Sequence, residues 1–169
     1  IIMTHGDDEG LILPPAIAPY QVVIVPVAAH KPGVLEKAEE LRARLSKFVR
    51  VKLDDSENSP GWKFAQWEMK GVPLRLEIGP KDIENGQCVL VRRDNREKAF
   101  TKLEDLEAAV PALLDALGKS LYARAEANRA GRTWTATTMD EVLERAGGEN
   151  GYIKTMWCGN LACEEMMKE

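Results

Sequence analysis

The stretch 61-GWKFAQWEMKGVPLRLEIGPKD-82 changes from helix signals to strand signals at a sharp break. Just before it, Ser59 and Pro60 are typical of a helix start, because a serine hydroxyl caps free backbone N–H groups and proline needs no N–H there. Gly71 can end the helix in the left-handed conformation, and Pro73 prevents the helix from continuing. We therefore predict a helix that ends at this break.

The residues after the break alternate strictly between apolar and charged side chains. Leu74, Leu76 and Ile78 point one way along an extended chain, and Arg75 and Glu77 point the other way. This pattern predicts a strand with one face on the core and its charges on the opposite face.

The segments upstream continue the alternation of strands and helices. The β-branched run Val22–Val25 indicates a strand covered on both faces, and Val51 and Leu53 alternate with charges in a short strand. Between these strands, residues 34–48 carry an apolar stripe at helical spacing, made of Val34, Leu35, Ala38, Leu41, Leu45 and Phe48.

The segments downstream predict two more strands and a long helical region. The pair Asn85-Gly86 is a hairpin signal, and the apolar run after it indicates a strand. Residues 96–102 predict a last edge strand. A helical region follows from Glu104 to about Arg129, and we expect it to restart at Pro111.

This order predicts an α/β fold with a mixed, mostly parallel β-sheet of about five strands flanked by three helices. A small α+β appendage follows, in which Thr138 and Glu141 form a capping-box pattern. The proline-rich sequence 13-LPPAIAPY-20 indicates a linker. We therefore divide the chain into residues 1–19, 20–128 and 129–169.

The charge is unevenly distributed along the chain. The net charge of the 169 residues is −4, but residues 61–102 carry nine Lys/Arg against six Asp/Glu, so this segment is +3 and the remainder is −7. A local basic face on an acidic protein suits selective contact with a polyanion, although a chance fluctuation explains the charge equally well.

The sequence also bears on the compartment. It has no apolar run of the roughly 18–20 residues that span a bilayer, so no membrane association is expected. Three cysteines, an odd number, fit a reducing compartment, and a cytoplasmic location is the expectation.

Charged and aromatic side chains flank the Gly-Val-Pro break. Glu68 and Arg75 can make paired hydrogen bonds to the edges of unstacked bases, and aromatic rings can stack on such bases. For Phe64 and Trp67, helical spacing favours packing in the protein instead. Gly79-Pro80-Lys81-Asp82 has no phosphate-loop spacing, and an ordinary surface turn is the simpler interpretation.

The cysteines and the first histidine give weaker signals. Cys158 and Cys163, in a C-x4-C spacing, are half of a tetrahedral zinc site, but two unligated thiols are the simpler interpretation. Cys88 lies in an apolar strand and is expected in the core. The sequence His5-Gly6-Asp7-Asp8 has no nucleophile or metal-binding motif beside it.

Three segments together carry a family likeness. The sequences IIMTHGDDEGLILPPAIAPYQVVIVPV, DDSENSPGWKFAQWEMKGVPLRLEIGPKDIENGQCVLVRRD and WCGNLACEE resemble the C-terminal third of prolyl-tRNA synthetases of the archaeal/eukaryotic-like type. The resemblance implies that residues 1–19 are the tail of a class II catalytic domain, after motif 3. It implies a class IIa anticodon-binding domain at 20–128 and the start of a zinc-binding-like domain at 129–169.

The resemblance also implies an activity and its partners. Such enzymes join L-proline to tRNA-Pro through prolyl-adenylate, with ATP and Mg²⁺, and the full-length protein is expected to be a homodimer. His5, Gly6 and Asp7 are implied to border the active site, whereas the ATP-contacting motifs lie upstream. These 169 residues alone are therefore not expected to be catalytic.

The same resemblance assigns residue roles. Glu68, Arg75 and Lys81 are implied to face the second and third anticodon bases, both guanine for proline. A further basic contact falls on Arg96 or Lys98, with Lys98 as our choice. Cys158 and Cys163 match two of four zinc-site cysteines, so zinc is a possible cofactor of an incomplete site.

Two other functions compete with tRNA recognition. An accessory domain that kept the fold but binds proteins would have no need of Glu68, Arg75 and Lys81. A small-molecule-binding α/β enzyme domain would need a nucleophile, an acid/base pair or a phosphate loop, and the sequence shows none.

Overall fold

A computed structural model describes residues 1–148 and 150–166. The chain divides into two compact units, Ile1–Leu121 and Tyr122–Glu169. The division into residues 1–19, 20–128 and 129–169 stays a prediction.

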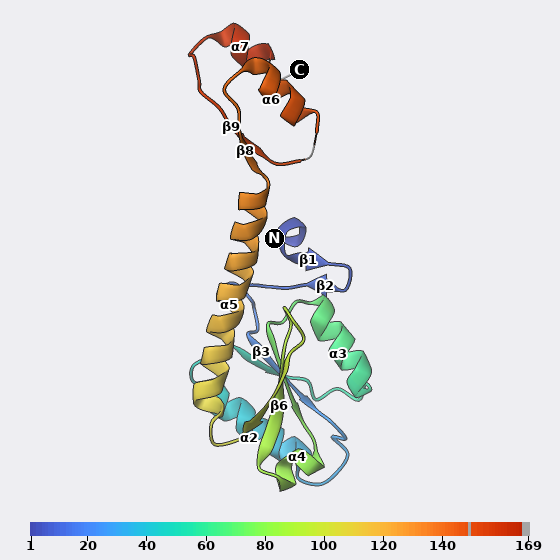
Figure 1. Ribbon diagram of the computed structural model, residues 1–169. Helices are drawn as coiled ribbons and strands as arrows, with labels where there is room; N and C mark the ends of the chain where they lie inside the picture. Colours follow the sequence, from blue (N-terminus) through green and yellow to red (C-terminus); the bar gives the residue numbers. More distant parts are fainter. Residues whose placement is uncertain (149, 167–169) are drawn as a thin grey trace. The chain divides into compact units, whose positions relative to one another are not determined.

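A five-stranded sheet forms the centre of the first unit (Figure 1). Its strands are β3 (Val22–Pro26), β4 (Val51–Leu53), β5 (Leu74–Ile78), β6 (Gln87–Arg92) and β7 (Lys98–Lys102), in the spatial order β4-β3-β5-β6-β7. The strand β3 pairs in parallel with β4 and β5, whereas β6 pairs antiparallel with β5 and β7. Four strands thus run in one direction and β6 runs against them, which confirms the predicted mixed sheet.

Two helices cover one face of this sheet. The helix α2 (Val34–Leu45) and the first turns of α5 (Leu106–Gly131) pack on Val22, Ile24 and the leucines of β5 in one apolar core. Two residues of the predicted α2 stripe are not part of it. Leu35 lies one position off the buried stripe and Phe48 lies beyond the end of the helix, so both are exposed.

The helix α5 does not restart at Pro111, contrary to our prediction. A proline in a helix removes one backbone hydrogen bond and crowds the preceding turn. Val110 and Leu114, on either side of Pro111, are buried against the sheet. Burial of the two side chains offsets the lost bond, and the helix continues unbroken.

The connection from β5 to β6 is longer than the predicted turn. A short helix, α4 (Pro80–Glu84), lies between the strands. The backbone N–H of Gly79 donates to Oδ2 of Asp82 at 2.9 Å, which fixes the start of α4. The Asn85-Gly86 pair therefore ends a helical turn and does not form a two-residue hairpin.

The opposite face of the sheet carries α3 (Pro60–Met69), which has Ser59 as its N-cap and Pro60 as its first residue, as predicted. Trp67 packs on Val23 and Val25 of β3, with Phe64 at the margin, so both aromatic residues pack in the protein as predicted. The indole Nε1–H of Trp67 donates to Oδ2 of Asp54 at 2.6 Å. The ammonium of Lys63, 1 % exposed, donates to the carbonyl of Asp54 at 3.0 Å.

The N-terminal segment forms α1 (Ile2–His5) and a hairpin of β1 (Gly6–Asp7) and β2 (Gly10–Leu11). Gly10 and Gly71 both have positive φ, at 133° and 75°. A Cβ on Gly10 would collide with the backbone of Met69, and a Cβ on Gly71 would collide with Leu11. The hairpin can therefore lie directly against the end of α3.

The second unit pairs β8 (Thr133–Thr135) in parallel with β9 (Tyr152–Lys154). The helix α6 (Met139–Ala146) connects these strands, and α7 (Leu161–Met166) follows them. Glu141 accepts from the backbone N–H of Thr138 at 3.2 Å, as the capping box predicts. The unit contains both helices and strands, which alternate along the chain. No helix in the described ranges of the chain has the length and apolar character that crossing a membrane requires.

Candidate nucleic-acid interface

The face of the sheet that carries α3 is only partly covered. Directly paired residues of neighbouring strands lie on the same face, so Val23, Arg75, Val91 and Lys98 form one row across β3, β5, β6 and β7. The next row consists of Val25, Glu77, Val89 and Phe100. The helix α3 packs on the β3 end of both rows. At the β7 end, Lys98 and Phe100 are exposed to solvent.

A compact polar cluster lies where α3 meets β5. Arg75 donates from Nη1 to Oε1 of Glu68 at 2.5 Å and from Nε to Oε1 of Glu77 at 2.9 Å. Its guanidinium carbon lies 4.0 Å from the ring centroid of Phe64. Two carboxylates and one aromatic face therefore fix the guanidinium in a single orientation.

The carboxylate of Glu68 remains accessible to solvent in this cluster. Its side chain is 29 % exposed, against 11 % for Arg75. The ion pair uses Oε1, and Oε2 accepts no hydrogen bond within the described part of the chain. A carboxylate held by an arginine can thus still accept from a planar ligand that approaches along the sheet.

The structure distinguishes Arg96 from Lys98, the two candidates for the basic loop contact. Arg96 forms an ion pair with Glu9 of the N-terminal hairpin. Lys98 shares the row of Arg75, is exposed, and has no acidic partner among residues 1–148 and 150–166. Its position on this face matches the choice of Lys98, whose role stays a prediction.

Lys81 lies apart from the cluster. It is exposed on α4, beyond the carboxyl end of β5, whereas Arg75 is the second residue of that strand. Three strand residues, from Arg75 to Ile78, span about 10 Å, and Lys81 lies beyond Ile78. The structure therefore brings Glu68 and Arg75 together and places Lys81 at the opposite end of the strand.

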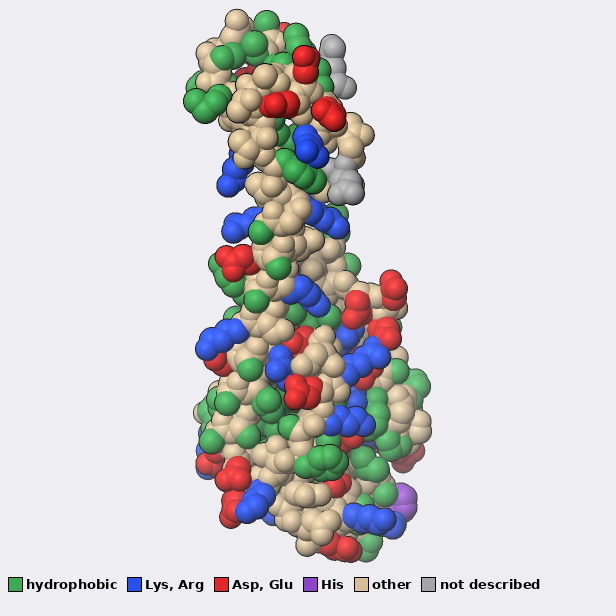
Figure 2. Space-filling view, viewed as in Figure 1, with side chains coloured by type: hydrophobic (Ala, Val, Ile, Leu, Met, Phe, Trp, Pro, Cys, Tyr) green, Lys and Arg blue, Asp and Glu red, His purple; other side chains and the backbone are tan. Residues whose placement is uncertain are grey.

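Most of the local basic excess is neutralised in the fold. Of the nine Lys/Arg in residues 61–102, six have an acidic partner: Lys63, Arg75, Arg92, Arg93, Arg96 and Lys102. Lys70 lies 4.5 Å from the ring centroid of Trp67. On the face that Figure 2 shows, basic and acidic side chains are interspersed over the sheet unit. The net +3 is therefore no measure of a basic surface, and Lys63 in particular is buried.

Sequence reasoning missed two residues of this region. Phe100 is 71 % exposed at the open end of the face, and alternation within β7 was its only signal. Arg93 is 5 % exposed and contacts both Asp7 and the backbone of Glu68. No local pattern points to Arg93, because its partners lie far away along the chain.

The comparisons with known proteins agree with this arrangement. The family model described as "Anticodon binding domain" matches residues 21–113, which include the sheet, α3 and the start of α5. The chain belongs to the anticodon-binding domain family.

Several curated proteins that are similar to this chain are named proline–tRNA ligases. A proline–tRNA ligase of Clostridium novyi is 60 % identical over 169 residues, which are 100 % of this chain and 35 % of that protein. A proline–tRNA ligase of Clostridium botulinum is 57 % identical over the same lengths, and proline–tRNA ligase 2 of Bacillus cereus is 54 % identical over 36 % of its length. The resemblance to prolyl-tRNA synthetases is thus confirmed along the whole chain. The archaeal/eukaryotic-like type stays a prediction.

The chain spans about a third of the length of these relatives. The anticodon-binding fold accounts for the sheet unit, whereas the N-terminal hairpin and the second unit lie outside the matched range. His5, Gly6 and Asp7 are found at the end of α1 and in β1. Asp7 accepts from both Nη atoms of Arg93, and these hydrogen bonds hold the pKa of Asp7 below its ordinary value.

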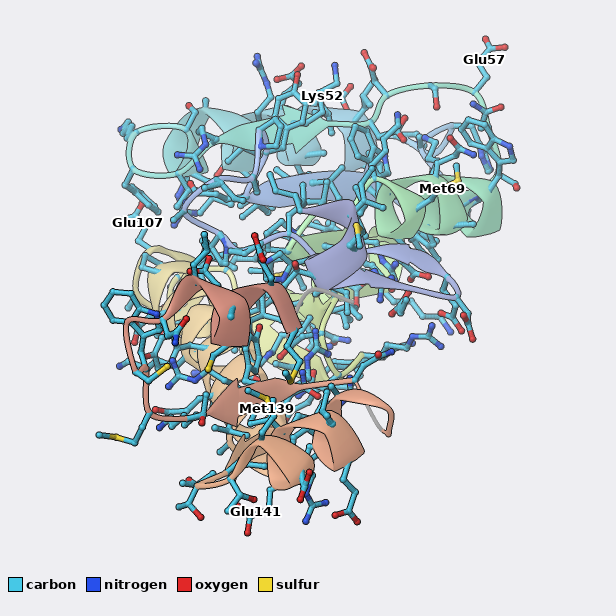
Figure 3. All side chains as sticks on the ribbon, turned by 90° about the horizontal axis from the view of Figure 1, so that it is seen from above. Lys52, Glu57, Met69, Glu107, Met139 and Glu141 are labelled. Carbon is cyan, nitrogen blue, oxygen red and sulfur yellow. The ribbon has the colours of Figure 1, made fainter. Side chains whose placement is uncertain are left out.

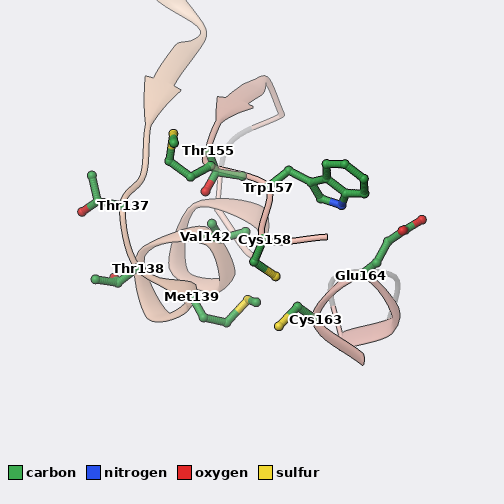
Figure 4. A pocket seen from close by; sticks show the side chains of 10 residues that line it. Thr137, Thr138, Met139, Val142, Thr155, Trp157, Cys158, Cys163 and Glu164 are labelled. Atoms are coloured by element: carbon green, nitrogen blue, oxygen red, sulfur yellow. The ribbon is translucent and has the colours of Figure 1, made fainter. Parts of the chain in front are cut away.

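The two cysteines of the second unit face each other beside Met139 (Figure 4). The backbone N–H of Asn160 and the thiol of Cys163 donate hydrogen bonds to the sulfur of Cys158, and both bonds lower the pKa of Cys158. The hydrogen bond between the two cysteines raises the pKa of Cys163. Within the described ranges, no third His, Cys, Asp or Glu completes a metal-binding group. The described residues therefore supply at most half of a zinc site. Burial raises the pKa of Cys88 to about 12, as expected of a core thiol.

Proposed function

We propose that the first unit recognises the anticodon of tRNA-Pro by reading guanine edges at the Glu68–Arg75 cluster. The observation that carries this proposal is a reachable carboxylate locked beside an oriented guanidinium on the open face of an anticodon-binding fold. The names of the relatives support proline as the amino acid.

The geometry suits guanine in an unstacked conformation. The Watson–Crick edge of guanine presents N1–H and N2–H donors, which one carboxylate can accept together, and its O6 and N7 atoms accept from arginine or lysine. Glu68 supplies the carboxylate, and Arg75 holds it in place and offers its remaining donors. A base that lacks the N1–H and N2–H donors would leave Glu68 desolvated without a partner, which costs affinity.

Two exposed basic side chains without acidic partners among the described residues lie elsewhere on the first unit. Lys81 at the end of β5 and Lys98 on β7 are exposed at separate positions. Because phosphate contacts position an RNA while base contacts specify it, these two lysines would orient the loop over Glu68 and Arg75. Phe100, exposed two residues from Lys98 on the same face of β7, offers a ring on which a base can stack.

The activity of the whole protein follows by the same inference. We infer that the longer protein is a proline–tRNA ligase, since relatives of which this chain is about a third carry that name. The resemblance to prolyl-tRNA synthetases further implies the use of ATP, Mg²⁺ and L-proline and a homodimeric state. Zinc at Cys158 and Cys163 would require ligands in addition to the residues described.

One binding experiment tests the proposed function. A stem-loop with the proline anticodon and a second loop with its two guanines replaced by adenines are titrated with the 169-residue chain at one fixed salt concentration. The expected result is tighter binding of the guanine loop, by about 5- to 150-fold for each base contact of about 1–3 kcal/mol. Equal affinity for both loops would refute anticodon reading.

A further inference from the structure

The buried arginine Arg93 links the N-terminal hairpin to the end of α3. Its Nη1 and Nη2 donate to the two carboxylate oxygens of Asp7 at 3.1 and 2.8 Å. Its Nε donates to the backbone carbonyl of Glu68 at 3.1 Å, and its own backbone N–H donates to the carbonyl of Pro73 at 2.9 Å. One guanidinium therefore connects β1 to the residue that we place at the base-reading site.

The hairpin and the segment after it also contact the end of α3 directly. The backbone of Gly10 lies against Met69, which Figure 3 shows at the end of α3 beside the N-terminal segment. The N–H of Leu13 donates to the carbonyl of Gly71 at 3.1 Å. Displacement of the hairpin would therefore free the turn that follows Glu68.

We propose that Arg93 is a positioning residue, which couples docking of the hairpin at residues 6–11 to the reading position of Glu68. The inference rests on the proposed function. Anticodon binding and hairpin docking then strengthen each other, because each favours the arrangement in which the last turn of α3 is fixed.

The physical reason lies in the burial of Arg93. Its side chain is only 3 % exposed, whereas that of Asp7 is 39 % exposed. Loss of the Asp7 carboxylate would leave a buried guanidinium without its charge partner, which is strongly unfavourable. The guanidinium would turn toward water and release the carbonyl of Glu68, and the carboxylate of Glu68 would lose its fixed position.

Asp7→Asn tests this coupling, with Asp8→Asn as the matched control. Both substitutions remove one negative charge from the same hairpin. Asp8 is exposed, and its carboxylate has no hydrogen bond or ion pair with any residue that the structure describes. Loss of a negative charge near RNA strengthens binding slightly on electrostatic grounds, so Asp8→Asn is expected to leave affinity unchanged or raise it less than about twofold.

Asp7→Asn is expected to change affinity in the opposite direction. It should weaken binding of the guanine loop about fivefold or more, since about fivefold is the lower end of typical coupling between two sites. Binding of the adenine loop should change much less. Asp7→Glu keeps the carboxylate and is expected to recover at least part of the preference for guanine. Equal behaviour of Asp7→Asn and Asp8→Asn would overturn the inference.

Hydrogen exchange provides a second measurement that does not depend on affinity alone. Addition of the guanine loop to the wild-type chain is expected to slow exchange of the Leu13 amide, which bonds to Gly71. In Asp7→Asn this protection should be lost, and in Asp8→Asn it should persist. Unchanged exchange in the wild type at saturating loop would refute the coupling.

The two proposals can fail separately. A wild-type chain that prefers the guanine loop, combined with equal effects of Asp7→Asn and Asp8→Asn, refutes the coupling and leaves the proposed function in place. A wild-type chain that binds both loops equally refutes the proposed function, and the coupling falls with it.

Discussion

Glu68→Ala is the most informative substitution in the base-reading cluster. It removes the carboxylate that pairs with Arg75 and leaves the second pair, from Arg75 to Glu77 at 2.9 Å, in place. The guanidinium also keeps its contact with Phe64. The variant therefore removes one reader of the base without dismantling the cluster.

Two effects of opposite sign determine the expected result. Removal of one negative charge about 8 Å from a phosphate, in a medium close to water, favours RNA binding by about 0.5 kcal/mol, or roughly twofold. Loss of the hydrogen bonds to guanine disfavours binding by about 1–3 kcal/mol. The guanine loop should therefore bind about 2- to 70-fold more weakly, whereas the adenine loop should bind about twofold more tightly.

Fluorescence anisotropy titrations of both loops at one salt concentration measure this difference. Glu36→Ala is the matched control, since Glu36 is exposed on α2, which packs on the opposite face of the sheet, and has no ion pair within the described part of the chain. It should leave the ratio of the two affinities unchanged. Tighter binding of both loops by Glu68→Ala would refute base reading and make Glu68 a helix-terminal surface charge.

Three further outcomes are expected. Phe100→Ala should weaken both loops to a similar degree, by about fivefold or more, because stacking does not read base edges, and Phe100→Trp should restore binding in the same titrations. Lys98→Ala should lower the slope of log affinity against log salt by about one, whereas Arg96→Ala, already paired with Glu9, should change it little. Iodoacetamide at about pH 8 should alkylate Cys158 before Cys163, since the pKa of Cys158 is lowered and the pKa of Cys163 is raised. Cys88, with a pKa of about 12, should react only after the chain unfolds. Mass spectrometry of peptides over time measures the order of alkylation, and a different order would contradict this reasoning.

Part of the candidate site could be predicted from the sequence. Alternation in β5 put Arg75 and Glu77 on the face opposite the leucines, and the structure confirms that side of the strand. Residue chemistry also pointed to Glu68, but its distance from Arg75 could not be predicted, since that distance depends on how the chain turns at Gly71. The prediction of a basic surface was wrong for Lys63, because a charge count does not show which ammonium groups are buried against Asp54.

Local sequence determined the elements of this protein, because the signals for them act over a few residues. A serine cap, a glycine at positive φ and a two-residue alternation are each complete within one turn or one strand. The sequence therefore placed α3, the break and β5 correctly. It failed at Pro111, where burial of Val110 and Leu114 on the sheet outweighs a local helix breaker.

Only the tertiary structure decided which charges pair and which remain available. Arg93 and Asp7 are separated by 86 positions in the chain, and Arg96 and Glu9 are also distant, so no local pattern could join them. Their pairing depends on how the hairpin docks on α3 and on which side chains lose water when it docks. For Arg93, whose side chain is 3 % exposed, burial removes the solvent that would otherwise screen its charge, and this desolvation is a property of the assembled fold.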